Sequence, residues 1–193
     1  MKKAFRIARI PIALALVVAG AAVMLYPQFT EWRYAWEQQG LADQAASAAK
    51  DVGANPQGGI PMPAGAVAKV VIPAIGLNGY VLEGTESEQL DRAVGHYPET
   101  PLPGEKGNAG LAGHRTMFGH PFRRLDELKA GDTIETWTAV RHAVYKVTRT
   151  QRVDPSDVGV IAPTDGTQIT LTTCNPVGSA RERLVVTGEL VAQ

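Results

Sequence analysis

Near its end the chain reads QITLTTC (residues 168–174) and, after a short connection, RLVVTGELV (183–191). Both runs are rich in β-branched residues, and the connection contains Pro, Gly and Ser, a pattern that predicts two strands joined by a turn. Side chains alternate between the two faces of a strand. Ile169 and Leu171 therefore share a core face, and Cys174 lies at the end of the opposite, polar face.

The preceding residues have the same texture from about residue 66 onward, with short apolar runs separated by turn residues. Asn78-Gly79 is a turn signal between the first two of these runs. The runs predict further strands at 69–73, 80–84, 108–114, 133–139 and 142–153. Many short strands with few helices predict a mostly β fold, either a barrel or a sandwich.

Two helices are predicted within this region, at 86–94 and at 121–132. In the second, apolar residues recur at a spacing of three and a glycine follows them, which is typical of a helical face and a helix stop. These residues are Phe122, Leu125, Leu128 and Gly131.

The start of the chain carries an apolar segment that is long enough to cross a membrane. Residues 10–26, IPIALALVVAGAAVMLY, contain no charge, and a basic flank precedes them: Lys2, Lys3, Arg6 and Arg9. A helix of about 20 residues spans the roughly 30 Å core of a bilayer. The basic flank predicts a cytoplasmic N-terminus and an exported remainder. A cleaved signal peptide is the alternative, and the length of the segment favours an uncleaved anchor.

These features divide the chain into four parts. We expect a cytoplasmic basic tail at 1–9, a transmembrane anchor at 10–30, a juxtamembrane segment and linker at 31–66, and a catalytic domain at 67–193. Residues rich in Ala, Gln and Glu predict that the helix continues over 31–50. The Gly- and Pro-rich residues 51–65 are then predicted to be a spacer that lifts the domain off the membrane.

Composition narrows the range of functions. The formal net charge is zero and no broad basic face is visible, so nucleic acid is not an expected partner. The chain has one cysteine, which excludes an intrachain disulfide. It lacks a tight acidic cluster with calcium-loop spacing, and its four histidines are scattered, so we expect neither a metal nor another cofactor.

Three residues stand where chemistry is favoured. Cys174 ends a strand on its polar face, a position that suits a reactive thiol better than a buried apolar filler, although both interpretations stay open. Arg183 opens the next strand, and a short loop can bring it back to Cys174; a solvated charge is its alternative. His114 ends a strand of small residues, and an ordinary surface or core histidine is its alternative.

Taken together, these residues resemble a known family. TLTTC (170–174), Arg183 nine residues after Cys174, and LAGHRT (111–116) resemble the sortases. The longer stretches TLTTCNPVGSARERLVVTGEL and GHRTMFGHPFRRLDEL are most similar to the class E sortases. The resemblance covers residues 67–191 and implies an eight-stranded sortase-type β-barrel with short helices, preceded by a transmembrane helix.

The resemblance also implies an activity. Cys174 would be the nucleophile, His114 the general acid and base, and Arg183 the group that steadies the oxyanion. The reaction would cleave an LPxTG- or LAxTG-like sorting signal between Thr and Gly and transfer the acyl group to an amine of the cell envelope. Phe118, Thr173 and Asn175 would contact the substrate; ordinary core packing is the alternative for Phe118.

The partners implied by the family are secreted proteins with a C-terminal sorting signal, and a peptidoglycan precursor or a pilin amine as acceptor. Where class E sortases often have a tyrosine after the GHRT block, this sequence has Met117-Phe118, which bears on the choice between LAxTG and LPxTG. The expected location is the plasma membrane, as a single-pass type II protein with its catalytic domain outside the cell.

Three other functions are compatible with parts of the pattern. A pilin-polymerising sortase would use the same residues. An envelope L,D-transpeptidase would also use a cysteine, but that family has Ser-x-Gly-Cys-Arg where this chain has Leu171-Thr172-Thr173-Cys174-Asn175. A non-catalytic anchored module would leave the coincidence of the three motifs unexplained.

Overall fold

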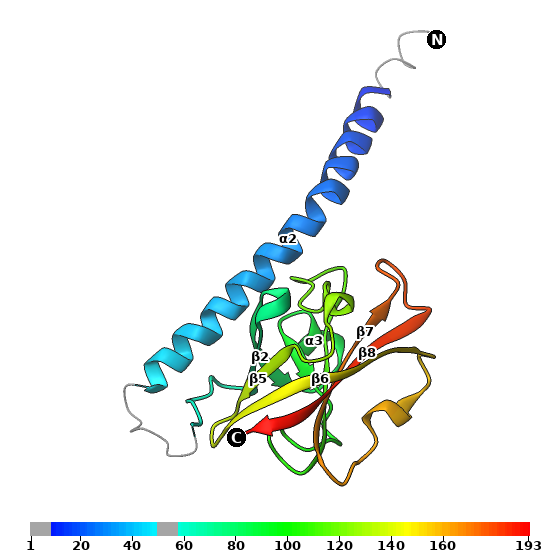
Figure 1. Cartoon of the computed structure of the whole chain (residues 1–193). Coiled ribbons are helices and arrows are strands. Elements are labelled where there is room, and N and C mark those ends of the chain that lie inside the picture. Colours follow the sequence, from blue (N-terminus) through cyan, green and yellow to red (C-terminus); the bar gives the residue numbers. More distant parts are fainter. Residues whose placement is uncertain (1–8, 50–57) are drawn as a thin grey trace, which may run out of the picture.

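The computed structural model describes residues 9–49 and 58–193, and its strands close into one barrel in the order β1-β2-β3-β4-β7-β8-β6-β5 (Figure 1). This confirms the prediction of a mostly β, eight-stranded barrel. The strands are β1 (Ala66–Ile72), β2 (Leu77–Glu83), β3 (Val94–His96), β4 (Gly107–Ala112), β5 (Thr133–Trp137), β6 (His142–Val153), β7 (Thr167–Asn175) and β8 (Glu182–Ala192). The helical elements are α2 (Arg9–Ala49), α3 (Ser87–Leu90), η1 (Pro73–Ile75), η2 (Leu125–Glu127) and η3 (Val158–Ile161).

Strand β7 organises the part of the barrel that carries the predicted site. It pairs in parallel with β4 and antiparallel with β8, so the three strands form one continuous section of the wall. The end of β4, the end of β7 and the start of β8 consequently lie at the same end of the barrel. The connection that leaves β4 and the loop between β7 and β8 meet there through a hydrogen bond from Gly178 N to Thr116 Oγ1 (3.1 Å).

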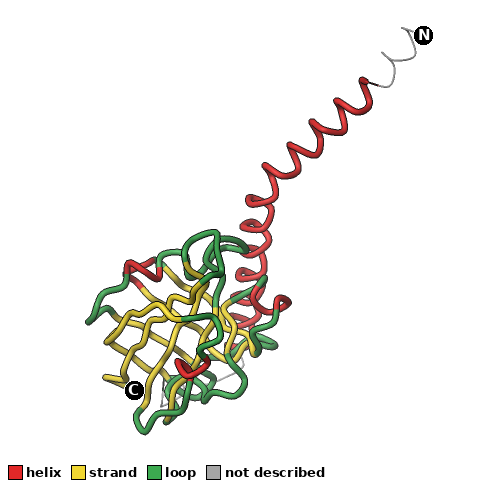
Figure 2. The backbone as a smooth tube through the Cα atoms, turned by 90° about the vertical axis from the view of Figure 1, so that its right-hand side faces the viewer, coloured by secondary structure: helices red, strands yellow, loops and turns green. Residues whose placement is uncertain are grey.

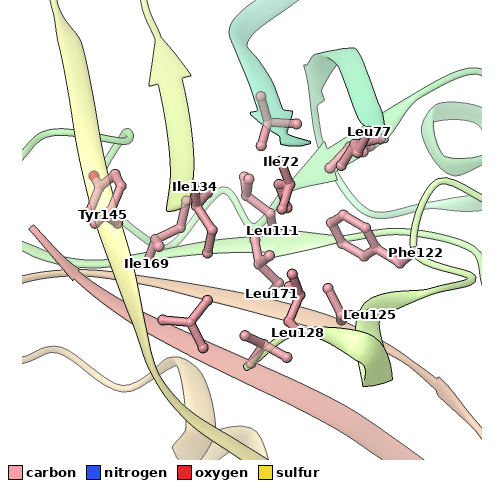
Figure 3. Close-up of a cluster of buried hydrophobic side chains, with 14 of the residues drawn as sticks. Ile72, Leu77, Leu111, Phe122, Leu125, Leu128, Ile134, Tyr145, Ile169 and Leu171 are labelled. Carbon is pink, nitrogen blue, oxygen red and sulfur yellow. The ribbon is translucent and has the colours of Figure 1, made fainter. Parts of the chain in front are cut away.

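Apolar side chains from all sides fill the barrel (Figure 3). The largest fully buried ones come from elements far apart in the sequence: Ile72, Leu111, Phe122, Leu125, Ile134, Tyr145, Ile169 and Leu171. Ile169 and Leu171 point into this core, as their alternation along the strand predicts. The core therefore packs against the inner face of β7, while Cys174 at the end of the strand stays partly exposed.

Two local predictions were wrong. Asn78 and Gly79 do not form a turn, because they lie inside β2, opposite Val71 and Val70 of β1. The chain reverses earlier, at η1, where Gly76 has a φ of 71° in the left-handed region that favours glycine. A proline that starts η1 and this glycine outweigh the Asn-Gly signal.

The helix predicted at 121–132 is also wrong. These residues form consecutive turns, with helical structure restricted to the single 3₁₀ turn η2. Phe122, Leu125 and Leu128 are nevertheless buried as one apolar set. A spacing of three fits a 3₁₀ turn, with its three residues per turn, as well as an α-helix, so the pattern identified the buried face but not the backbone.

The remaining predicted elements have shifted ends, and β3, η1 and η3 were not predicted. The helix predicted at 86–94 is only one turn, Ser87–Leu90, and Val94 already belongs to β3. The strand predicted at 142–153 is found with those bounds, and the others begin or end within three residues of their predicted limits. Differences of this size are common when the ends of elements are predicted from sequence.

The long helix α2 has two different halves (Figures 1 and 2). Its N-terminal part extends away from the barrel, and residues 13–29 are exposed although most of them are apolar. By length and composition this helix can cross a membrane, with a mean hydropathy of 1.7 over an 18-residue window. Its C-terminal part packs against the barrel, where Leu41 and Ala45 are buried with Tyr80 and Leu82 of β2.

The predicted continuation of the helix over 31–50 is confirmed as far as Ala49. Residues 51–57 of the predicted spacer lie outside the described residues. Beyond them the chain already runs along the barrel, because Gly58 forms a β-bridge with Arg141 and Ile60 N donates to Thr138 O (3.0 Å). The docked half of α2 continues directly into the exposed apolar half, and the spacer stays a prediction.

Candidate functional site

The ladder between β7 and β8 determines where Cys174 and Arg183 lie. The two residues are Cα partners in an antiparallel register that runs without a shift from Gln168–Glu189 to Asn175–Glu182. Directly opposed residues in such a pair project to the same face, with Cβ atoms about 4.5–5.5 Å apart. The sequence prediction that a short loop folds Arg183 back onto Cys174 is therefore confirmed as a backbone arrangement.

Both side chains are partly exposed. Cys174 is a free thiol of intermediate burial at the end of β7, so it is not part of the apolar interior. Arg183 donates from Nη1 to the backbone oxygens of Ala180 and Glu182 (3.3 and 3.4 Å), which holds the guanidinium against the β7–β8 loop.

His114 reaches the same end of the barrel from β4. Ala112 is opposite Thr172 in the parallel register, and the ladder extends one step further because Gly113 N donates to Thr172 O (3.2 Å). The hydroxyl of Thr173 donates to Gly113 O (2.7 Å) and ties the two chains together again. His114 follows immediately, at the level of Cys174 along the neighbouring strand.

After His114 the chain makes a compact loop that we call the histidine segment, residues 114–122. Its two ends meet where Phe122 N donates to His114 O (3.1 Å). Phe118 and His120 have positive φ values of 53° and 35°, on either side of Gly119 at 68°. Non-glycine residues rarely adopt this conformation, and each costs on the order of 1–3 kcal/mol unless its surroundings support it.

Other parts of the chain supply that support. Phe122 is fully buried and lies so close to Gly113 that a Cβ atom there would come within 2.8 Å of its ring. The ring of Phe118 lies 5.3 Å from the ring of His114, between centroids. Nε2 of His114 is 3.2 Å from Oδ1 of Asp91, which follows α3. The imidazole is therefore bordered by an aromatic ring and a carboxylate.

The predicted substrate-binding residues differ in how they are placed. Phe118 is partly exposed and its ring lies beside that of His114. Thr173 is 3% exposed, and its hydroxyl is used by Gly113 O. Asn175 is 6% exposed and bonds both Arg115 and Glu182, the latter at 2.6 Å. The roles of all three in substrate binding stay predictions, and the last two have intramolecular partners that suit a bracing role.

The face of β7 that carries Cys174 is polar, but its middle side chains are buried rather than exposed to solvent. Thr170 and Thr172 are buried, although the alternating pattern gave them to the polar face. Thr170 Oγ1 donates to Asn108 Oδ1 (2.7 Å), and Thr172 Oγ1 lies 3.0 Å from the hydroxyl of Tyr97. Surrounding loops thus cover this face and leave Cys174, at its end, accessible.

Sequence reasoning missed two groups next to the site. Arg115 is 4% exposed; its guanidinium bonds Asn175 and lies 2.8 Å from the carboxylate of Asp126, and Nη1 is 3.5 Å from Cys174 O. It therefore braces the backbone that carries the thiol. Asp91 was also missed, because an acidic residue after a one-turn helix gives no signal in a sequence. Asp91 is 23 residues from His114 in the sequence, and only the folded structure shows that their side chains are in contact.

The arrangement brings a thiol, a guanidinium and an imidazole to one end of a barrel. Such a set suits nucleophilic attack on a carbonyl, with a cation for the developing oxyanion and a titratable group for the leaving amine. Over the described ranges 9–49 and 58–193, no three or more His, Cys, Asp and Glu side chains form a group that could hold a metal ion.

Comparisons with known proteins identify one family. The sortase domain profile matches residues 70–191. Sortase SrtE1 of Streptomyces coelicolor is 35% identical over 92% of this chain and 55% of its own length. Sortase SrtE2 of the same organism is 31% identical over 91% of this chain and 79% of its own length. The chain thus spans about half of SrtE1.

Solved structures of sortases have the same fold as the barrel. Sortase E1 from Streptomyces coelicolor, determined with a tripeptide in its active site, has a TM-score of 0.62 and 37% identity, over 66% of this chain and 88% of that one. Sortase E from Streptomyces avermitilis has a TM-score of 0.60 and 36% identity, over 66% and 88% of the two chains.

Proposed function

Because the chain belongs to the sortase family, whose domain spans residues 70–191 here, we propose that it cleaves a sorting signal of the LPxTG or LAxTG type between Thr and Gly and transfers the acyl group to an amine. Sortases are cysteine transpeptidases, and the relatives reported above, SrtE1 and SrtE2, are class E sortases. We assign Cys174 as nucleophile, His114 as general acid and base, and Arg183 as the oxyanion group.

In the first half of the reaction, the Cys174 thiolate attacks the carbonyl carbon of the Thr residue. A carbon–sulfur bond forms, and the tetrahedral oxyanion is stabilised by the Arg183 guanidinium. The carbon–nitrogen bond to Gly then breaks, and the leaving amine takes a proton from His114. The product is a thioester between the enzyme and the sorted protein.

In the second half, an acceptor amine attacks the thioester carbon and gives its proton to His114. A new carbon–nitrogen bond forms and the carbon–sulfur bond breaks, which returns the Cys174 thiolate. Splitting one amide exchange into two acyl transfers is the benefit of a covalent intermediate. No external oxidant, metal or nucleotide is needed to balance either step.

The observation that carries the proposal is the register of β7 and β8. It makes Cys174 and Arg183 Cα partners, so both side chains project from the same face at the end of the ladder. The position of His114, directly after the last hydrogen bond between β4 and β7, supports its assignment as the third group. These placements also argue against a lone structural thiol.

We further propose that the exposed apolar part of α2 anchors the chain in the plasma membrane, with the barrel outside the cell and the basic N-terminal flank inside. The apolar length and the flanking charge support this orientation. Cys174 is the single cysteine, so a membrane-impermeant maleimide tests the orientation directly. Labelling in intact cells is expected, and labelling only after lysis would contradict it.

The activity is tested with the full chain in detergent micelles, incubated with LAxTG and LPxTG peptides and with candidate amines. We expect a mass increase on Cys174 that corresponds to the acyl-enzyme, followed by ligated peptide when an amine is present. Cys174→Ala should form neither species, since it lacks the attacking sulfur. Ligation by this variant would refute the assignment, and a wild-type chain inert to every peptide would refute the proposed substrate class.

A further inference from the structure

The docked half of α2 contacts the residues around His114, and this contact suggests a role beyond anchoring. Nη2 of Arg33 lies 3.6 Å from Oδ2 of Asp91. The other carboxylate oxygen of Asp91, Oδ1, lies 3.2 Å from Nε2 of His114. One carboxylate thus bridges a residue of the helix and the histidine that we assign to catalysis.

A second route joins the same two residues. The guanidinium carbon of Arg33 lies 5.6 Å from the centre of the Phe118 ring, within the range of a cation–π contact. The Phe118 ring in turn lies 5.3 Å from the His114 ring, at an angle of 35°. Arg33 therefore contacts both groups that border the imidazole, its carboxylate and its aromatic neighbour.

The position of Arg33 is set by the contacts of residues that follow it on α2. The ring of Tyr34 fills the space over Gly119, where a Cβ atom would come within 2.1 Å of it, and burial raises the pKa of Tyr34 well above its usual value. One turn later, the amide of Gln38 accepts from Tyr80 N (2.8 Å) and donates to Arg92 O (3.0 Å). Arg33 is thus held by a helix that is fitted to the barrel.

We infer that the juxtamembrane part of α2 belongs to the active site: Arg33 holds the carboxylate of Asp91, and Asp91 fixes the ring of His114. Asp91 is a positioning residue, since it acts through the histidine. A neutral imidazole has one N–H and one lone pair, so a carboxylate facing Nε2 selects the tautomer with its proton there and leaves Nδ1 as the acceptor. This role rests on the proposed function of His114.

An ion pair of this kind contributes little to stability, because both partners are partly exposed: 39% of the Arg33 side chain and 25% of that of Asp91. Its removal is therefore expected to change the orientation of His114 while leaving the barrel folded. A neighbouring pair gives a matched control. Glu37 lies 3.2 Å from Arg92, one turn further along α2, and docks the helix to the barrel without contacting His114.

The first test reads the histidine itself and needs no substrate. The full chain is labelled with ¹⁵N-histidine in detergent micelles, and the ring nitrogen shifts of His114 are assigned with a His114→Gln variant. We expect the tautomer with the proton on Nε2 in the wild type and in Glu37→Gln, and a mixture in Asp91→Ala. His96, whose Nδ1 lies 3.0 Å from Glu83, is an internal reference that should not change.

The second test measures acyl-enzyme formation on a peptide that the wild type accepts. Asp91→Ala should lower kcat by about 10- to 100-fold with KM nearly unchanged, the scale expected when a reacting group is misplaced. Asp91→Asn keeps an oxygen that accepts the Nε2 proton, so it should lose less. Arg33→Met should lower kcat about threefold, the scale of a partly exposed ion pair, and Glu37→Gln should match the wild type.

The outcomes separate this inference from the proposed function. An unchanged tautomer and an unchanged kcat in Asp91→Ala would overturn the positioning role while leaving the transpeptidase intact. A loss of kcat that follows the loss of thermal stability, and that Glu37→Gln shares, would also overturn it, since docking alone would then be the cause. A wild-type chain without activity on any of the sorting-signal peptides would refute the proposed substrate class. The tautomer measurement needs no substrate and would still test whether Asp91 orients the ring of His114.

Discussion

Cys174 and Arg183 lie side by side in a continuous β-ladder, whereas His114 lies at the start of a loop that other parts of the chain hold in place. The ladder repeats the same backbone hydrogen bonds along the strands and has core residues behind it, so the thiol and the cation are placed by regular structure. The histidine segment has two non-glycine residues with positive φ and depends on contacts from α2, from α3 and from the core.

This difference teaches that the site combines a pair placed by strand register with a third group placed by side-chain contacts. Nucleophile and cation can be aligned once, by register, because their distance matters in both halves of the reaction. The histidine gives a proton in one half and takes one in the other, and the contacts from Asp91 and Phe118 border its ring. The following predictions test whether substitutions in the β7–β8 ladder and substitutions around His114 change kcat and the free energy of unfolding in different ways.

Removing the core anchor of the histidine segment should have the largest effect. Phe122 is fully buried and closes this segment under His114, so Phe122→Ala leaves a cavity and should lower the free energy of unfolding by about 3–5 kcal/mol. We also expect kcat to fall at temperatures where the variant is still folded, because His114 loses its support. Chemical denaturation and peptide turnover measure the two effects.

Ile134 of β5 provides the control for that experiment. It is equally buried and belongs to the same core, but it lies outside the histidine segment. Ile134→Ala should lower the free energy of unfolding by a similar amount, about 2–5 kcal/mol, as large-to-small core substitutions do. It should leave the kcat of the folded protein near the wild-type value. Equal losses of kcat in both variants would show that the segment has no special dependence on Phe122.

The cation in the ladder should matter for the reaction and little for the fold. Arg183→Ala removes the group that we assign to the oxyanion, and such losses typically lower kcat by about 10²–10³-fold. Arg183→Lys keeps the positive charge but lacks the planar set of donors, so its kcat should lie between those of the wild type and Arg183→Ala. Arg181, an exposed arginine of the β7–β8 loop, is the matched control, and turnover by Arg181→Ala should resemble the wild type. A similar loss in both variants would point to general charge effects.

Most of the barrel could be read from the sequence, because it depends on local patterns. The alternation in QITLTTC and RLVVTGELV predicted β7 and β8, and the core positions of Ile169 and Leu171 followed from it. The placement of Arg183 opposite Cys174 also followed, because a short loop between antiparallel strands restricts the register. The site residues themselves were tied together by their resemblance to a family rather than by any calculation of distance.

The sequence could not predict features that depend on contacts between distant residues. Residues 121–132 have a helical spacing of apolar side chains, but tertiary packing makes them a series of turns, because Phe122 and Leu125 must enter the core while the chain turns back to His114. Asn78-Gly79 is a strong turn signal in isolation, yet pairing with β1 keeps both residues in a strand. In both cases long-range burial outweighs a local preference.

The docking of α2 on the barrel likewise could not be predicted from the sequence. Arg33, Gln38 and Leu41 lie on one side of a helix that was predicted to continue past the membrane, but nothing in their order indicates the surface that receives them. The partner surface is assembled from β2, from the end of α3 and from the histidine segment, which the fold brings together. An interaction of this kind becomes visible only when both surfaces are present.

The smallest predicted effect concerns the hydrogen bond that joins the two regions. Thr173 of β7 donates its hydroxyl to Gly113 O, one residue before His114, and is buried there. Thr173→Val keeps the shape and removes the donor, so the free energy of unfolding should fall by about 0.5–1.5 kcal/mol. Thr148→Val removes an exposed hydroxyl that also bonds a backbone oxygen, Thr187 O at 3.3 Å, and should change stability less. If Thr173→Val lowers kcat by more than its stability loss explains, the ladder helps to hold the histidine; if kcat is unchanged, the contacts from Asp91 and Phe118 are sufficient to hold it.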